Sequence, residues 1–168
     1  PGGLPPFVPV GTYVAAEKSI GFDGVIYFYA NTERARDTAF EAALKEQLDW
    51  KLSGLSPYVV PADHSLIEQI TGNDIIRGVT IVHGPQGREL RLPLADPKLN
   101  EKIEAFNYNG RQITNFEMES SSLAGLAALM GHRAMTVCCI IAGRVDKNMN
   151  TNYKGSLTGL IETVLERK

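Results

Sequence analysis

The sequence predicts an α/β domain in which helices pack in layers against a mixed or parallel sheet. Short segments rich in β-branched and aromatic residues alternate with longer segments whose apolar residues recur every three or four positions. The segment 134–142 is apolar almost throughout, which is typical of a central strand covered on both faces. A chain of 168 residues without internal repeats or linkers is expected to form a single domain, 1–168.

Strands are expected where short apolar runs are bounded by Gly, Pro or Asp. Ahead of them, residues 1–9 predict a loop rich in Pro and Gly. The predicted strands are 13–16, 25–29, 58–60, 78–82, 113–118 and 134–142. Of the first two, 25–29 (Val-Ile-Tyr-Phe-Tyr) has the stronger β-forming composition, and the segment 21–24 before it indicates a turn.

Helices are expected where a capping residue precedes an apolar stripe. Thr32 is the expected N-cap of the first helix, and Asp96 followed by Pro97 opens another. Gly72 and Gly131 are expected to end two of the helices. The predicted helices lie between 32 and 53, at 64–70, from 96 onward, at 120–130 and at 153–166. Their expected buried stripes are Phe40, Ala43, Leu44 and Leu48; Leu99, Ile103 and Phe106; Leu123, Leu126, Ala127 and Met130; and Leu157, Leu160, Ile161, Val164 and Leu165.

Charge and composition argue against several classes of protein. The chain has 17 Lys and Arg against 19 Asp and Glu, a net charge of -2, which disfavours a generic nucleic-acid or anionic-membrane surface. Its longest apolar stretches run about nine residues, short of the ~18 that a membrane span requires. The first residues lack the basic and apolar regions of a signal peptide. Cys138 and Cys139 are adjacent in an apolar run and predict buried, reduced thiols. The expected compartment is the cytoplasm.

The triplet Glu117-Met118-Glu119 is the most informative candidate for a binding site. It falls where a predicted strand ends and a helix begins, and ligands of open α/β sheets bind beyond the carboxyl ends of strands. A carboxylate that accepts two hydrogen bonds suits a vicinal diol, because both hydroxyls of a sugar can donate to it. The alternative is a pair of ordinary glutamates at a helix start, where the helix dipole favours negative charge.

A second candidate, Gln86-Gly87-Arg88, follows a predicted strand in a loop rich in Gly and Pro. The Gln amide offers a donor beside an acceptor, which matches the edge of a pyrimidine dione. The Arg supplies donors for negative charge on a departing base. A solvated hairpin tip explains the same residues. Arg144 directly follows the apolar run and is either a functional group at a strand end or a surface arginine.

Other motifs are less informative. Gly2 and Gly3 are candidates for the end of a backbone nest that cradles phosphate. His64, His83 and His132 lack metal-ligand spacing to one another or to the cysteines, so no metal site is expected. The sequence has no serine elbow, kinase signature or complete P-loop.

Together these motifs resemble the nucleoside phosphorylase superfamily, and within it uridine phosphorylase. The strongest match is 115–121, Asn-Phe-Glu-Met-Glu-Ser-Ser, followed by a helix and the apolar run 137–141 that leads to Arg144. The segments 2–4 (Gly-Gly-Leu) and 21–24 (Gly-Phe-Asp-Gly) resemble the part of the family's sequence just after its phosphate loop. The resemblance spans nearly all of the chain. It implies a three-layer α/β/α fold with a mixed central sheet, of which these residues form the C-terminal two-thirds.

The resemblance also implies roles for individual residues. Met118 would pack on the ribose and Glu119 would hold its 2′ and 3′ hydroxyls, with Glu117 in the same substrate site. Gln86 and Arg88 look like the pair that reads uracil in uridine phosphorylases. Arg88 and Glu119 are therefore the expected catalytic residues.

The remaining expectations concern the base and the phosphate. Arg144 falls where the family places an arginine near the base, and Gly2 would contact phosphate. The aspartate by which purine-specific relatives protonate the base is missing after 142–143, which favours a pyrimidine. Val82 stands where an aromatic residue often contacts the nucleobase. The family's N-terminal portion, with its first glycine loop and phosphate-binding arginines, has no counterpart in these residues.

The expected activity is reversible phosphorolysis of uridine to uracil and ribose 1-phosphate. Inorganic phosphate is the co-substrate, and no cofactor is expected. Two alternatives stay open: a purine nucleoside phosphorylase or nucleosidase, and a truncated, non-catalytic chain that binds nucleosides. By resemblance, the chain is expected to form a homo-oligomer, either a dimer or a larger ring such as a hexamer.

Overall fold

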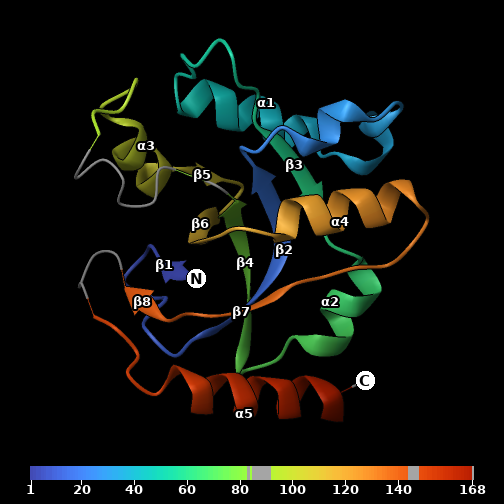
Figure 1. Cartoon of the computed structure of the whole chain (residues 1–168), viewed down its shortest axis with the longest axis vertical. Helices are drawn as coiled ribbons and strands as arrows, with labels where there is room; N and C mark the ends of the chain where they lie inside the picture. The colour runs from blue at the N-terminus through green and yellow to red at the C-terminus, as the bar shows by residue number, and fades with distance from the viewer. Residues whose placement is uncertain (83, 85–91, 144–147, 168) are drawn as a thin grey trace.

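A central mixed sheet surrounded by helices forms the body of the molecule (Figure 1). The computed structural model describes residues 1–82, 84, 92–143 and 148–167. Its strands are β1 (Gly2–Gly3), β2 (Tyr13–Gly21), β3 (Tyr58–Pro61), β4 (Ile75–Val82), β5 (Asn107–Tyr108), β6 (Arg111–Glu117), β7 (Val137–Cys139) and β8 (Ala142–Gly143). The helices are α1 (Thr38–Gln47), α2 (His64–Ile70), α3 (Leu99–Ala105), α4 (Ser120–Leu129) and α5 (Tyr153–Glu166), with short 3-10 helices η1 (Val25–Phe28) and η2 (Thr32–Ala35). The predicted α/β class with a mixed sheet is confirmed.

The sheet brings the ends of its parallel strands to one edge. The strand order is β3-β2-β4-β6-β1-β8, with β7 paired to β2 and β5 to β6. Strands β2, β4 and β6 are parallel, whereas β3 and β1 run antiparallel to their neighbours β2 and β6. Val82 at the end of β4 lies opposite Glu117 at the end of β6. The two strands therefore deliver the chain to the same edge.

Helices α1 and α3 pack on the largest hydrophobic cluster through the stripes that the sequence predicts. Phe40, Leu44 and Leu48 of the first stripe are buried, as are all three residues of the second. The first helix begins later than predicted, because Thr32 belongs to η2 and the N-cap is Asp37, whose carboxylate accepts from Phe40 N at 3.0 Å. No described helix is both long and apolar enough to traverse a bilayer.

The strand predicted at 25–29 is wrong, since these residues form η1. The carboxylate of Asp23 accepts from Val25 N at 2.8 Å, and Gly24 adopts a left-handed φ of 73°, so the chain turns before it can extend. Only Ile26 of η1 is buried, while Phe28 is 86% exposed. A β-forming composition is therefore overridden by a turn whose hydrogen bonds are local.

The single central strand predicted at 134–142 is also wrong. The run divides into β7, which pairs with β2, and β8, which pairs with β1. Between them, Ile140 N donates to Thr12 O at 2.9 Å and Ile141 N donates to Pro1 O at 3.0 Å. The run thus satisfies its backbone groups against several segments instead of one neighbouring strand. One of those segments is β1, which replaces part of the loop predicted at 1–9.

The predicted buried stripe of α4 is wrong as well. Leu123 and Met130 are 52% and 68% exposed, and the helix instead buries small residues. These are Ser120, Ser121, Ala124 and Gly125. Small side chains let the helix approach η1 closely, because a Cβ on Gly125 would lie 3.0 Å from Ile26 Cδ1. In α5, whose bounds match the prediction, only Leu160 of the expected stripe is buried.

Gly21 at the end of β2 yields a prediction about stability. A Cβ at this position would overlap the fully buried ring of Tyr58. We expect Gly21→Ala to lower the free energy of unfolding by about 1–3 kcal/mol, the usual cost of overpacking a core. Urea unfolding followed by circular dichroism measures the change. Gly54→Ala is the matched control, because a Cβ on Gly54 meets nothing within 4 Å. Equal midpoints for the two variants would contradict the clash.

Candidate functional site

The strands that carry or precede the residues predicted to bind substrate lie side by side in the sheet. Gly2 in β1 lies opposite Phe116 of β6 and opposite Ala142 of β8. The chain leaves β4 at Val82, next to Glu117, and leaves β8 directly before residue 144. Gln86, Arg88 and Arg144 follow these two strand ends in the sequence and lie outside the described residues. The topology thus places the end of β4, which precedes Gln86 and Arg88, next to Glu117. Strand β8 runs antiparallel to β6, so its first residue, Ala142, lies nearer the Glu117 edge than its last residue, Gly143.

A hollow of about 560 Å³ opens at this edge. Its wall includes Pro1, Gly2, the stretch 116–119, the stretch 136–139 and Leu157. Figure 1 shows the N-terminus beside β8 at this edge. The predicted residues Gly2, Glu117, Met118 and Glu119 therefore line one hollow, whose volume is in the range of small-molecule sites.

Glu117 and Glu119 have different environments. Glu117 is 7% exposed. Its carboxylate accepts from Glu119 N at 2.8 Å, from Ser120 N at 3.0 Å and from Ser120 Oγ at 2.6 Å. Met118 and Glu119 are exposed at the hollow, and the Glu119 side chain makes no capping hydrogen bond although Glu119 is the N-cap of α4. The carboxylate of Glu117, from the end of β6, takes over that capping.

A second carboxylate, that of Asp23, also binds the first turn of α4. Ser121 Oγ donates to Asp23 Oδ2 at 2.9 Å, and the Tyr58 hydroxyl donates to Asp23 Oδ1 at 2.7 Å. Burial is the main cause that raises the pKa of the Tyr58 hydroxyl, which stays protonated as a donor. Sequence reasoning missed this network, because Asp23 in a turn and Tyr58 in a strand carry no signal of their contact.

The strand β7 also contributes to the hollow, and sequence reasoning missed it. Cys138 and Cys139 are free, buried thiols, as predicted, and both lie in its wall. Burial, aided by the nearby Glu117 carboxylate, raises the pKa of the Cys138 thiol from 9.0 to about 12. The thiol is therefore neutral at physiological pH and is a poor nucleophile there.

The raised pKa of Cys138 predicts a loss of stability in alkali. Above pH 9.0 the unfolded thiol releases its proton while the folded thiol keeps it until about pH 12. The stabilisation is complete below the unfolded pKa and declines as the pH rises through this window. We expect the fall in unfolding free energy between pH 8 and pH 10 to be smaller in Cys138→Ala, by about 1 kcal/mol. Urea titrations at both pH values measure it, and parallel falls in parent and variant would contradict it.

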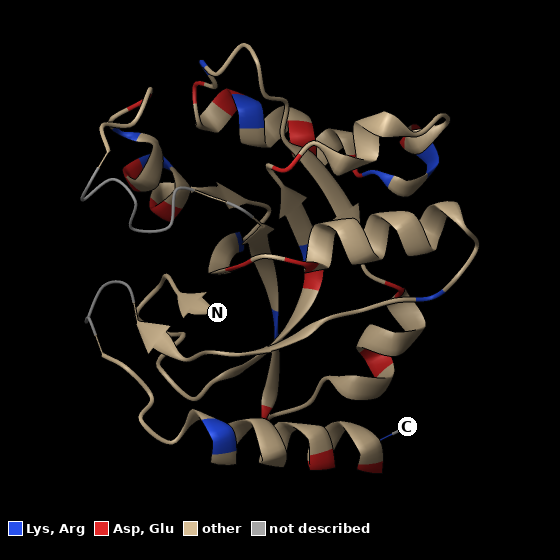
Figure 2. Ribbon diagram, viewed as in Figure 1, with Lys and Arg blue, Asp and Glu red and all other residues tan. Residues whose placement is uncertain are grey.

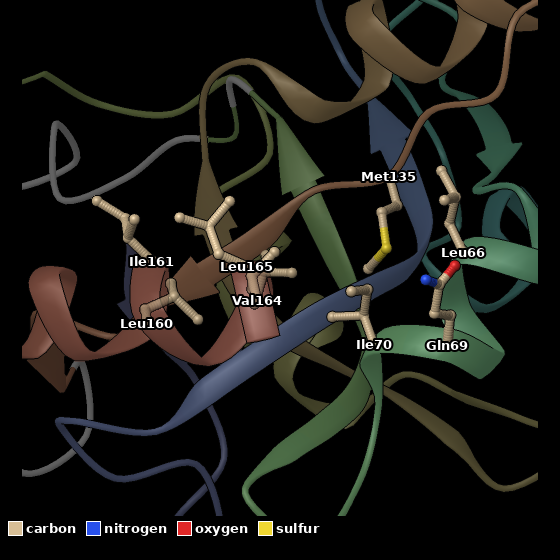
Figure 3. Close-up of a pocket in the computed structure, with 9 residues that line it drawn as sticks. Leu66, Gln69, Ile70, Met135, Leu160, Ile161, Val164 and Leu165 are labelled. Atoms are coloured by element: carbon tan, nitrogen blue, oxygen red, sulfur yellow. The ribbon is translucent and has the colours of Figure 1, made fainter. Parts of the chain in front are cut away.

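Another hollow lies between α2 and α5 and is apolar (Figure 3). It measures about 430 Å³, and side chains such as Ile70 from α2 and Leu160 from α5 face it. None of the nine described residues that line it is titratable, so they supply no acid, base or nucleophile for a reaction. The carboxylates of Glu117 and Glu119 line the other hollow, at the β6–α4 turn.

Charge at the surface is mixed over the described residues. Figure 2 shows acidic and basic positions interspersed on the helices and loops. The part of the chain that the structure describes contains no group of three or more His, Cys, Asp or Glu arranged to hold a metal ion.

A mixed α/β sheet with acidic side chains and a hollow at the carboxyl ends of parallel strands is typical of a small-molecule-binding protein. Residues 2–158 match the model of the Phosphorylase superfamily, and the chain belongs to this superfamily. The resemblance inferred from the 115–121 motif is thereby confirmed. A search of curated proteins finds no match.

A solved structure from Trypanosoma brucei has the same fold. It is a nucleoside phosphorylase described as showing uridine phosphorylase activity, and it superimposes with a TM-score of 0.81 at 22% sequence identity. The match covers 99% of this chain and 60% of the Trypanosoma brucei chain. This chain therefore spans somewhat less than two-thirds of the length of that relative.

Proposed function

We propose that this protein catalyses the phosphorolysis of uridine to uracil and ribose 1-phosphate. The observation that carries the proposal is the arrangement of four strands around one hollow: β4 and β6 end side by side at Val82 and Glu117, and the first residues of β1 and β8, Gly2 and Ala142, line the same hollow as Glu117. Membership of the Phosphorylase superfamily and the uridine phosphorylase activity ascribed to the Trypanosoma brucei protein support the choice of reaction.

In the proposed mechanism, phosphate attacks the anomeric carbon while the glycosidic bond lengthens through an oxocarbenium-like state. Glu119 accepts hydrogen bonds from the 2′ and 3′ hydroxyls, and Met118 packs on the sugar; both are exposed at the hollow. Gln86 and Arg88 stabilise the uracil anion as it departs, which is charge stabilisation rather than covalent catalysis. Arg144 lies near the base and Gly2 contacts the phosphate. Inorganic phosphate is the co-substrate, and no cofactor takes part in the proposal.

The choice of a pyrimidine base rests on the residues of β8 and the residue that follows it. Ala142 and Gly143 lead into Arg144, so the chain lacks the aspartate that purine-specific relatives use to protonate the base. A purine nucleoside phosphorylase or a nucleosidase is the alternative within the family. A chain that binds nucleosides without turnover is the alternative from another class.

The test is release of free base, followed by chromatography. We expect uracil from uridine only when phosphate is present, together with an equal amount of ribose 1-phosphate. Base release without phosphate would indicate a nucleosidase, and faster release from inosine would indicate a purine enzyme. Uridine binding without turnover at saturating phosphate would favour the non-catalytic alternative.

The proposal includes a homo-oligomer, either a dimer or a hexamer, in the cytoplasm. Large apolar side chains on the surface support self-association: Phe28 is 86% exposed, Met130 68% and Leu123 52%. Light scattering coupled to size-exclusion chromatography measures the assembly. A mass equal to the 18.4 kDa monomer at all concentrations would contradict it.

A further inference from the structure

We infer that Glu117 is a positioning residue that sets the direction of the Glu119 side chain without itself binding the sugar. The inference rests on the proposed function, because it requires that Glu119 holds the ribose. It also revises the sequence-based grouping of Glu117 with the residues that touch substrate. The argument starts from the way in which α4 begins.

Helices α1 and α2 begin in the ordinary way, with the side chain of the N-cap residue. Asp37 caps α1 by accepting from Phe40 N, and Asp63 caps α2 by accepting from Leu66 N, each at 3.0 Å. The N-cap of α4, Glu119, makes no side-chain capping bond, and the same holds for the N-caps of α3 and α5. Glu117 accepts the N–H groups of Glu119 and Ser120 instead, from the last residue of β6. A Glu119 side chain that does not cap its own helix can serve a ligand.

The same hydrogen bonds fix the backbone at Glu119. Because Glu117 Oε2 accepts the Glu119 N–H at 2.8 Å, the peptide that joins Met118 to Glu119 has one orientation. That orientation determines where the Cα–Cβ bond of Glu119 points from the N-cap, whose φ and ψ are -128° and -27°. Asp23 also holds the first turn of α4, because Ser121 Oγ donates to its carboxylate at 2.9 Å. A carboxylate that must meet two adjacent hydroxyls depends on such fixed geometry.

The charge of Glu117 matters as much as its shape. Its two oxygens accept hydrogen bonds from the N–H groups of Glu119 and Ser120 and from the Ser120 hydroxyl. A Gln side chain keeps one acceptor and turns the other into an NH₂ donor that faces N–H groups, which repel it. Glu117→Gln is therefore expected to loosen the turn while it preserves side-chain volume.

The experiment compares the binding of uridine with that of 2′,3′-dideoxyuridine, which lacks both hydroxyls, by calorimetry on the full chain. We expect Glu117→Gln to lower the affinity ratio by about tenfold, the size of one charge-assisted hydrogen bond. Glu119→Gln should lower the ratio similarly, and the double variant should lose little more, because both changes break one interaction. Ser120→Ala, which removes a single bond to Glu117, tests the same point with less risk to folding. Affinity for uracil should not change in any of them.

Asp63→Ala is the matched control, because it removes the side-chain cap of α2, away from the hollow. The control should lower stability and leave the affinity ratio unchanged. An unchanged ratio in Glu117→Gln and Ser120→Ala, with a lowered ratio in Glu119→Gln, would overturn the positioning role and leave the proposed function standing. A parent chain that binds both ligands equally would overturn the proposed function, and the positioning role with it.

Discussion

Replacing Arg88 by alanine is expected to lower kcat/KM for uridine phosphorolysis by roughly two to three orders of magnitude. In the proposed reaction the glycosidic bond breaks as negative charge grows on uracil, and a guanidinium that stabilises this charge would act mainly in the transition state. We therefore expect kcat to fall with kcat/KM, while KM for phosphate changes little. Initial rates of uracil release at varied uridine and fixed phosphate measure the effect.

Arg133→Ala is the control for this variant, because Arg133 is exposed and donates to Ser65 Oγ near the start of α2. The control should keep the activity of the parent. If Arg88→Ala falls by less than threefold, Arg88 is not the residue that stabilises the departing base. A proportionate fall in both variants would point to a general loss of surface charge instead.

Replacing Arg36 by alanine is expected to destabilise the fold by about 3–5 kcal/mol, because it leaves a buried carboxylate without its cation. Glu41 is 3% exposed, and its oxygens accept from Arg36 Nε at 2.8 Å and from Val59 N at 2.9 Å. The hydrogen bond to Glu41 is the largest cause that raises the pKa of Arg36. The pair joins Arg36, which follows η2, to α1, and the bond from Val59 N joins Glu41 to β3. Thermal unfolding by calorimetry should show a Tm lower by roughly 6 to 20 °C for a chain of this size.

Lys51→Ala supplies the comparison, since Lys51 pairs with Asp49 at 2.8 Å but both side chains are about two-thirds exposed. Exposed pairs contribute little, so no measurable change in Tm is expected. Glu41→Gln in the Arg36→Ala background should recover part of the loss, because it removes the buried charge. Equal Tm values for Arg36→Ala and Lys51→Ala would show that burial does not decide the strength of this pair.

Elements whose signal is local could be predicted from the sequence. The helix at His64–Ile70 and the helix at Tyr153–Glu166 have the predicted bounds, because caps and apolar periodicity act within a few residues. The Glu-Met-Glu turn was also predicted at the end of a strand, and β6 ends at Glu117. The resemblance carried by the same motif predicted the superfamily, and the match over residues 2–158 confirms it.

Elements whose partners are distant could not be predicted in this way. The run 134–142 looks like one strand by composition, yet its pairing is divided because β2 and β1 supply the neighbours for its two parts. The buried face of α4 depends on the close approach of Ile26 to Gly125, which a count of apolar residues cannot reveal. Both errors arise from tertiary contacts that override local preference.

The sequence by itself determined the α/β class through residue types and short spacings, and its resemblance to a known family indicated the superfamily and the candidate residues at the β6–α4 turn. Only the tertiary structure distinguished the two glutamates. Glu117 is buried with its oxygens on the start of α4, whereas Glu119 is exposed at the hollow. The spacing of the two glutamates in the sequence does not distinguish them. The difference arises because the chain turns where β6 ends, and hydrogen bonds from Ser120 to Glu117 and from Ser121 to Asp23, which is distant in the sequence, fix that turn.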